Sequence, residues 1–262
     1  MSRMQLAYER LRDLIVTLQL APGERLSESW LESFFQGSRT PIRAALGRLE
    51  AEGLVQRGKP GYMVAPIDLR EIEQVYAFRE TVESEAVRLV CNRATPAELD
   101  AIAEILDSCQ ADTPSDEWYC VATDFHVEIA RLSDNPFFAR SLDDAMTRVS
   151  RARWLKIWSQ TSRDHAWAEH RRILELIRAR KAEEAATETA RHVRESRDWL
   201  LKSLSDYRRS LRTLGFAVVA WRRRARGNGR PMRVGRRPAE RLDGLIAAAS
   251  LTPALHLCPI AR

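Results

Sequence analysis

Hydrophobic residues recur every three or four positions along most of the 262-residue chain, the spacing of amphipathic helices. The first such stretch runs from Leu6 to Leu18 and ends before Ala21-Pro22-Gly23, a turn sequence. A second follows Ser27-Glu28-Ser29, which can cap a helix, and places Leu31, Phe34 and Phe35 on one face. A third occupies residues 38–55, so the pattern predicts three helices in one compact module.

The third stretch combines a buried face with a cationic start. Its apolar positions are Ile42, Ala45, Leu46 and Leu49, and its arginines, Arg39, Arg43 and Arg48, lie off that face. We expect Thr40 to cap the helix and Pro41 to occupy its first position, where no N–H is needed. Positive charge at a helix N-terminus suits a phosphate or the acceptor edge of a guanine.

Two short alternating stretches follow Gly53, a residue suited to a left-handed helix cap. Residues 54–57 and 62–65 are predicted strands on either side of Gly58-Lys59-Pro60-Gly61, which makes a hairpin with a basic tip. Three helices and a basic hairpin describe a winged helix-turn-helix over residues 1–66.

Three segments in this module, LAPGERLSE, SRTPIRAALGRLEAEGLV and the wing ending YMVAP, resemble the GntR family of bacterial transcription regulators. Family members often carry Arg where Ser29 stands here, which removes one DNA contact. The resemblance implies contacts to DNA from Ser38, Arg39, Thr40 and Arg43 and from the wing residues Gly58, Lys59 and Gly61.

From residue 68 to about 211 the pattern is helical almost throughout, with a capping box and Pro96 at Thr95-Pro96-Ala97-Glu98. The segments FRETVESEAVRLV, DFHVEIARLSDNPFF and EHRRILELIRARKAEEAATETARHV resemble the helical FCD-type effector domain of the FadR subfamily. The predicted fold is therefore mainly α: a winged helix-turn-helix with a small hairpin, then an all-helical effector-binding bundle.

In the resembling domains, histidines at the positions of His126, His170 and His192 ligate a divalent metal, here zinc or nickel. An aspartate one turn before the first histidine completes that set, but Ala122 stands there in this chain. Asp124 lies about 200° around the helix from that position and is expected to point away. His165 and Glu169 are also expected to face elsewhere, which leaves a three-histidine site or direct binding of an acidic effector.

A small carboxylate effector also needs cationic partners, and the candidates are Arg79 and Arg151, with Arg148 and Arg153 on the same predicted helix as the latter. A charged outer face is the simpler interpretation of each arginine. The tryptophans Trp154, Trp158 and Trp167 either wall the pocket or belong to the core.

The net charge of +6 belongs to the C-terminal segment, since residues 212–262 carry 11 Arg against 2 acidic residues. That segment, rich in Arg and Gly, is expected to be disordered. Three interpretations stay open: a basic arm for DNA, docking of LGFAVVAW (214–221) on the bundle, or read-through or a frameshift. Deletion after Leu211 is expected to leave specific operator binding intact.

The four cysteines are scattered, and no run approaches the ~18 apolar residues of a membrane span. These features favour a cytoplasmic location. The resemblance implies a non-enzymatic repressor of transcription that responds to a carboxylate effector. Because one recognition helix covers few base pairs, we expect a homodimer on a pseudo-palindromic double-stranded operator. Two alternatives remain: a metal-dependent hydrolase with an appended DNA-binding module, and a constitutive DNA-binding protein whose effector pocket has decayed.

Overall fold

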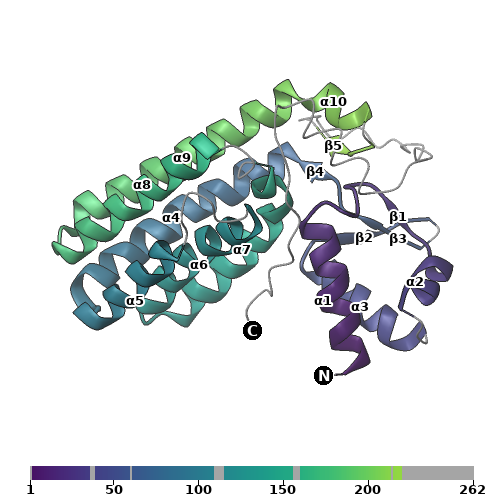
Figure 1. Ribbon diagram of the computed structural model, residues 1–262, viewed down its shortest axis with the longest axis horizontal. Helices are drawn as coiled ribbons and strands as arrows, with labels where there is room; N and C mark the ends of the chain where they lie inside the picture. The colour runs from purple at the N-terminus through teal and green to yellow at the C-terminus, as the bar shows by residue number, and fades with distance from the viewer. Residues whose placement is uncertain are drawn as a thin grey trace. The chain divides into compact units, whose positions relative to one another are not determined.

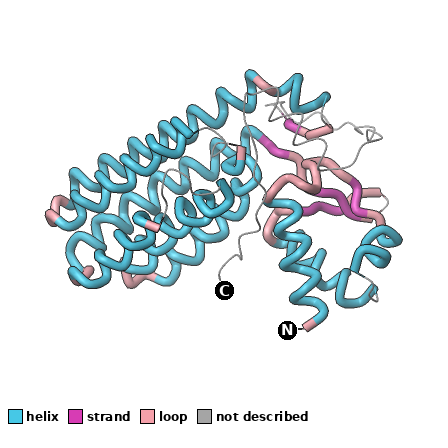
Figure 2. The backbone as a smooth tube through the Cα atoms, viewed as in Figure 1, coloured by secondary structure: helices cyan, strands magenta, loops and turns pink. Residues whose placement is uncertain are grey.

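The computed structural model describes residues 2–35, 39–59, 61–108, 115–155, 160–213 and 215–219. Within these residues, 2–70 and 202–219 form one compact unit, and 71–201 form a second. The first unit combines helices with short strands, whereas the second is helical (Figures 1 and 2). The predicted class, mainly α with a small wing sheet, is confirmed.

The first unit contains three helices and a three-stranded antiparallel sheet. The helices are α1 (Arg3–Val16), α2 (Glu28–Phe35) and α3 (Arg39–Ala51), and the strands are β1 (Arg25–Leu26), β2 (Val55–Arg57) and β3 (Tyr62–Val64). β3 lies in the middle, with Met63 opposite both Arg25 and Gln56. The predicted hairpin is confirmed, and β1 is an additional edge strand that the sequence pattern did not reveal.

Apolar side chains from all three helices form the core of this unit. Leu11 and Ile15 of α1, Leu31 of α2, and Leu46 and Leu49 of α3 are fully buried. Gly53 ends α3 with a positive φ of 74°, a conformation that costs glycine little. These helices therefore pack into a single module, and the face of α3 opposite Leu46 and Leu49 lies at the surface.

The predicted start of α3 was wrong by about two residues. The helix begins at Arg39, so Thr40 lies inside its first turn and Pro41 is its third residue. Proline fits there because the first four N–H groups of a helix have no acceptor within it. Ser38, which precedes the helix, lies outside the described residues.

α1 and α3 are also joined by a polar cluster around the buried ring of Tyr8. The hydroxyl of Tyr8 donates to Glu52 at 2.7 Å, and the guanidinium of Arg48 lies 3.7 Å from the ring centroid. Burial and the hydrogen bond to Glu52 raise the pKa of Tyr8 to about 12. The folded chain thus favours the protonated phenol.

Replacement of Tyr8 by Phe is expected to cost about 1 kcal/mol of unfolding free energy near pH 7. Because the folded pKa of Tyr8 exceeds its unfolded value, its contribution is fully present below pH ~10 and is lost as the pH rises towards 12. Urea titrations of both chains between pH 7 and 11 should show the difference shrinking as the pH rises. A constant difference would contradict a role for this proton.

Residues near the end of the described chain belong to the first unit. α10 (Arg208–Thr213) leads to β5 (Val218–Val219), which pairs in parallel with β4 (Ile67–Asp68). The segment LGFAVVAW was expected to dock on the bundle or to be disordered with the rest of 212–262. For residues 215–219 both expectations are wrong, because these residues join the first unit; residues 214 and 220–262 lie outside the described part.

The second unit is built from helices α4 to α9. They are α4 (Leu69–Arg93), α5 (Pro96–Asp107), α6 (Ser115–Leu132), α7 (Pro136–Trp154), α8 (Gln160–Arg178) and α9 (Ala182–Asp206). The predicted capping box at Thr95 is present, with the Thr95 hydroxyl accepting from the Glu98 amide. The candidate histidines and arginines of the predicted effector site lie on these helices.

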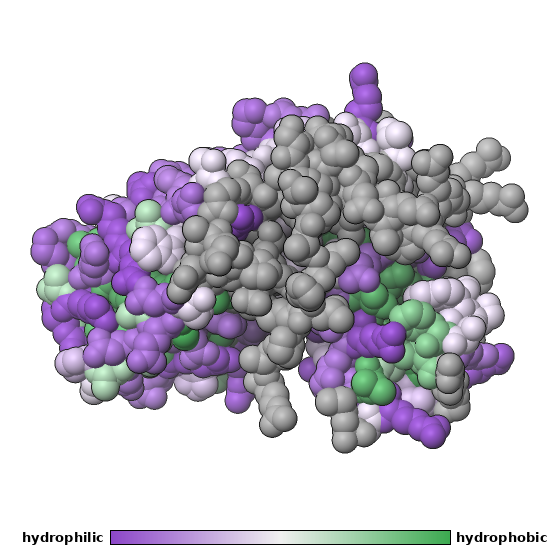
Figure 3. All heavy atoms as spheres, viewed as in Figure 1, coloured by the Kyte–Doolittle hydropathy of each residue, from purple (hydrophilic) through white to green (hydrophobic). Residues whose placement is uncertain are grey.

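Two apolar clusters hold these helices together. One joins α4, α5, α6, α8 and α9 through residues such as Val90, Phe125 and Ile177; the other joins α4, α6 and α7 through Ala86, Ala130 and Leu142. Hydrophilic side chains cover much of the bundle surface in the view of Figure 3. No helix in the described ranges is long and apolar enough to cross a membrane.

Candidate functional site

A small, partly open cavity lies among α4, α6, α7, α8 and α9 of the second unit. Its lining mixes imidazole, guanidinium and hydroxyl groups with two alanines. The lining residues are Tyr76, Arg79, Ala122, His126, Arg153, Ser162, Arg163, Ala166, His170, His192 and Ser196. The bundle thus holds a small cavity into which several nitrogen and hydroxyl groups converge.

The three predicted histidines meet at this cavity. His126, His170 and His192 are each at least 95% buried and come from α6, α8 and α9. One ring nitrogen from each lies within 4.8 Å of the others, and the Nε2 atoms of His170 and His192 are 3.3 Å apart. The fold therefore brings together the three histidines that the family resemblance singled out.

Glu83 of α4 holds the first of these rings. One of its carboxylate oxygens lies 2.8 Å from Nδ1 of His126, and the other accepts a hydrogen bond from Nε of Arg79 at 2.7 Å. Both Arg79 and Glu83 are almost fully buried. In a neutral imidazole whose Nδ1 donates to this carboxylate, Nε2 is the nitrogen that keeps a lone pair.

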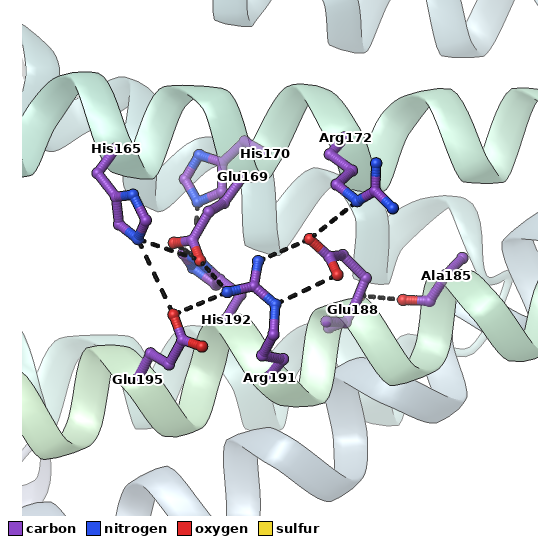
Figure 4. A network of polar contacts seen from close by, with 10 residues as sticks. His165, Glu169, His170, Arg172, Ala185, Glu188, Arg191, His192 and Glu195 are labelled. Atoms are coloured by element: carbon purple, nitrogen blue, oxygen red, sulfur yellow. Dashed lines mark hydrogen bonds and ion pairs between the residues drawn. The ribbon is translucent and has the colours of Figure 1, made fainter.

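Glu169 of α8 holds His192 in the same way, and the expectation that Glu169 faces elsewhere was wrong. Figure 4 shows its carboxylate between the two helices, with one oxygen 2.8 Å from Nδ1 of His192. The other oxygen lies 3.0 Å from Arg191 and 3.5 Å from His165. Facing helices bring Glu169 and His192 together although Glu169 lies about 100° around α8 from His170.

Beyond Glu169, the polar network reaches the protein surface. Arg191 pairs with Glu195 at 2.7 Å and with Glu188 at 2.7 Å, and Glu188 also pairs with Arg172 (Figure 4). Hydrogen bonds to Glu188 and Glu195 raise the pKa of Arg191, so this guanidinium stays charged. This charge lies directly against the buried carboxylate of Glu169 that contacts His192.

This donor set fits a divalent cation of the zinc or nickel type. Two imidazole nitrogens on a tetrahedral zinc are about 3.3 Å apart when each bond is about 2.05 Å, which matches the separation between His170 and His192. Carboxylates behind metal-binding histidines fix the tautomer and raise ligand basicity. Glu83 and Glu169 supply both effects.

The residue one turn before His126 gives no fourth ligand. Ala122 lines the cavity, and Asp124 is solvent-exposed, in agreement with its expected orientation. From the described lining residues, the protein therefore offers a metal three nitrogens and no carboxylate.

Among the candidate arginines, Arg79 and Arg153 line the cavity and Arg151 does not. Arg153 of α7 donates to the hydroxyl of Thr123 at 2.9 Å and to the carbonyl of Ala122 at 3.3 Å. Arg151 is buried elsewhere on α7, where burial lowers its pKa to about 10. Arg148 is exposed and pairs with Glu71.

Neither described tryptophan among the candidates lines the cavity. Trp154 is buried in α7, and Trp167 donates its indole N–H to the carbonyl of Leu106 in α5. Trp158 lies outside the described residues. The core interpretation of Trp154 and Trp167 therefore agrees with their positions.

The candidate DNA-binding residues lie on the first unit. Arg39, Thr40 and Arg43 are exposed in the first turns of α3, and Arg39 pairs with Glu32 of α2. In the wing, Lys59 and Gly61 are exposed, Gly58 is half-buried, and Gly61 has a positive φ of 78°. The described candidates thus lie at the start of α3 and at the tip of the hairpin between β2 and β3.

Comparison with known proteins decides the family. Residues 4–61 match the bacterial regulatory proteins of the gntR family, and residues 74–195 match the FCD domain. An HTH-type transcriptional regulator in an unstable DNA locus of Streptomyces ambofaciens is 32% identical over 194 residues, 71% of this chain and 80% of that protein. The chain belongs to the GntR family.

Further relatives of this GntR regulator share both of its parts. The Nta operon transcriptional regulator of Aminobacter aminovorans is 29% identical over 192 residues, 72% of this chain and 90% of the relative. The HTH-type transcriptional repressor RspR of Escherichia coli is 22% identical over 195 residues, 73% of this chain and 86% of the relative. The chain is thus a GntR-family, DNA-binding transcription regulator with an FCD domain.

Solved structures support the fold. E. coli McbR/YncC aligns with a TM-score of 0.65 at 19% identity, over 78% of this chain and 99% of the other. A GntR regulator from Rhodococcus sp. RHA1 aligns with a TM-score of 0.64 at 21% identity, over 77% and 99%. The overall predicted order, winged helix-turn-helix and then helical bundle, is that of this family.

Sequence reasoning about this GntR regulator missed several residues at the cavity, among them Arg163, which lines it. Glu83 and Glu169 look like surface positions in the sequence because each neighbours other charged residues, and Arg153 was ranked below Arg151. A helical wheel places Glu83 one turn beyond Arg79, so the pair was detectable. The contact between Glu169 and His192 depends on packing between α8 and α9.

Proposed function

We propose that this regulator is a homodimeric repressor whose affinity for a pseudo-palindromic operator is set by a small carboxylate effector bound in the cavity of the FCD domain. One observation carries the proposal: three buried imidazoles and the guanidiniums of Arg79, Arg153 and Arg163 line a single cavity. Such a lining favours an anionic ligand. The relative RspR of E. coli is a transcriptional repressor, which supports the direction of regulation.

We also propose that a divalent zinc or nickel ion is held by His126, His170 and His192. The ion would supply a Lewis-acidic position for a carboxylate oxygen, and the protein's own groups do the rest. Glu83 and Glu169 hold two of the rings, while the cationic lining attracts the rest of the effector. Because Ala122 gives no carboxylate, the anion that balances the cation's charge comes from the effector.

The protein is proposed to act through binding alone, in the cytoplasm. A general base placed beside the histidine cluster would favour the hydrolase alternative. Glu83 and Glu169, the two carboxylates that contact the cluster, are each engaged with an imidazole Nδ1 and an arginine. Their geometry is that of positioning groups, not of a base that reaches a substrate.

The proposal is tested with DNA selected from a random library by the intact protein. Thermal shift with a panel of small mono-, di- and tricarboxylates, with and without EDTA, should identify stabilising ligands and their metal dependence. A stabilising carboxylate should lower affinity for the selected DNA. Stabilisation by none of them, with unchanged DNA affinity, would leave the constitutive alternative.

Replacement of Glu169 by Gln is expected to lower affinity for Zn²⁺ by about 10–100-fold, because the amide cannot orient and polarise His192 as the carboxylate does. Calorimetric titration of the chelator-treated protein with ZnCl₂ measures this. The matched control is Glu188→Gln, which changes the same surface network without touching a histidine. Equal losses of Zn²⁺ affinity in both variants would show that the total charge of the network, and not the contact between Glu169 and His192, determines the affinity.

A further inference from the structure

The DNA-binding unit is made from two separated stretches of chain, 2–70 and 202–219. The chain leaves this unit through β4 into α4 and comes back to it from α9 through α10 and β5. Both connecting helices carry residues of the cavity: Tyr76 and Arg79 on α4, and His192 and Ser196 on α9. The two ends of the bundle are thus tied to the same unit.

The returning segment has a defined local structure. Gly215, with φ of 88°, follows α10, and its amide donates to the carbonyl of Arg212 at 3.0 Å. The next amide, of Phe216, donates to the carbonyl of Leu211 at 2.9 Å. This pair of bonds is a Schellman motif, which ends a helix and sets the direction of the chain beyond it.

Backbone hydrogen bonds then fix the segment on the unit. Ala217 donates to the carbonyl of Pro22 at 2.7 Å, and its own carbonyl accepts from the amide of Ile67 at 2.9 Å. The side chains of Leu211, Phe216 and Val218 are at least 95% buried. Burial of three apolar side chains stabilises the attachment far more than two backbone bonds alone would.

The Pro22-Gly23 turn packs closely against this segment. Gly23 has φ of 87°, and a Cβ placed on it would lie 2.5 Å from Cβ of Ala217, closer than atoms can approach. The amide of Gly23 also donates to Val64 of β3 at 2.9 Å. The segment therefore rests against the turn that supports the sheet of the wing.

We infer that residues 208–219 form a C-terminal strap that completes the DNA-binding unit and gives it a second anchor to the bundle. A unit joined through one connector can swivel about it, whereas two connectors held side by side in one sheet leave far fewer orientations. A movement of α4 relative to α9 at the cavity would then be transmitted to the DNA-binding unit through β4 and β5.

The first test compares two truncated chains, one ending at Tyr207 and one ending at Ala220. Loss of the strap is expected to lower the melting temperature of the DNA-binding unit by on the order of 10 °C and to speed amide exchange at Ile67 and Gly23. The chain ending at Ala220 should match the full chain. Identical behaviour of the two truncated chains would overturn the inference.

A double-mutant cycle keeps the inference testable if the shorter chain does not fold. Gly23→Ala in the full chain should lower the melting temperature through both backbone strain and the clash with Ala217. Adding Ala217→Gly, which removes the clashing atom, should restore part of that loss. Additive effects of the two substitutions would show that Ala217 does not rest on the turn.

A third experiment tests regulation and rests on the proposed homodimer. The full chain should distinguish the selected operator from versions with 2 or 4 base pairs inserted at its centre, by at least about fivefold, and the strapless chain should distinguish them less. If the full chain ignores spacing, the dimeric proposal fails, while the melting and exchange results still decide whether the strap exists. Equal discrimination by both chains would show that the strap does not orient the unit.

Discussion

Replacement of Arg43 by alanine is expected to weaken binding to the selected operator by about 1–3 kcal/mol, roughly 5–150-fold at fixed salt. Arg43 is exposed on α3 and follows the helix start by one turn, which places it where a recognition helix contacts bases. Fluorescence anisotropy with labelled operator and with a scrambled duplex measures the loss. Specific binding should fall more than binding to the scrambled duplex.

Arg48 provides the control, since it lies on the same helix and carries the same charge. Its guanidinium stacks on Tyr8 and its Nε donates to Glu52, so it is committed to the contact between α1 and α3. Arg48→Ala should reduce stability and change operator affinity much less than Arg43→Ala. Equal losses would indicate that bulk charge, and not position, determines recognition.

Replacement of His170 by alanine is expected to lower affinity for Zn²⁺ by more than ~100-fold and to abolish the response of operator binding to the effector. Operator affinity without effector should stay unchanged, because His170 lies in the bundle and α3 is in the other unit. ZnCl₂ titration and operator binding with each stabilising carboxylate measure the two effects.

His165→Ala is the matched control in the same helix. His165 is exposed and contacts Glu169 and Glu195 at the outer end of the network, without reaching the cavity lining. The variant should bind Zn²⁺ with little change. A response that survives in His170→Ala would remove the histidine cluster from the proposed effector site.

Local signals predicted much of this fold. The capping box at Thr95, the left-handed Gly53 and the apolar faces of α1 and α3 each depend on residues close in sequence, so single-chain reasoning could find them. The histidine cluster was found through its resemblance to a family pattern. Its assembly requires three helices that no local rule brings together.

Contacts between distant residues account for what was missed. β1 is two residues long and exists because Met63 pairs with Arg25 across the turn at Gly23. Glu169 looks misplaced on a wheel of α8, yet packing against α9 sets it on His192. The C-terminal strand resembled an unstructured continuation, because its partner, Ile67, lies 151 positions earlier in the chain.

The pairing of β4 with β5 also has a consequence for how this protein could be re-engineered. Because the two ends of the bundle meet in one small sheet, the bundle occupies the place of a domain insertion in a loop of the DNA-binding unit. Insertions succeed where the termini of the inserted domain lie close together. A different ligand-binding bundle with similarly close termini could therefore replace residues 71–201, creating a sensor with new chemistry and the same operator.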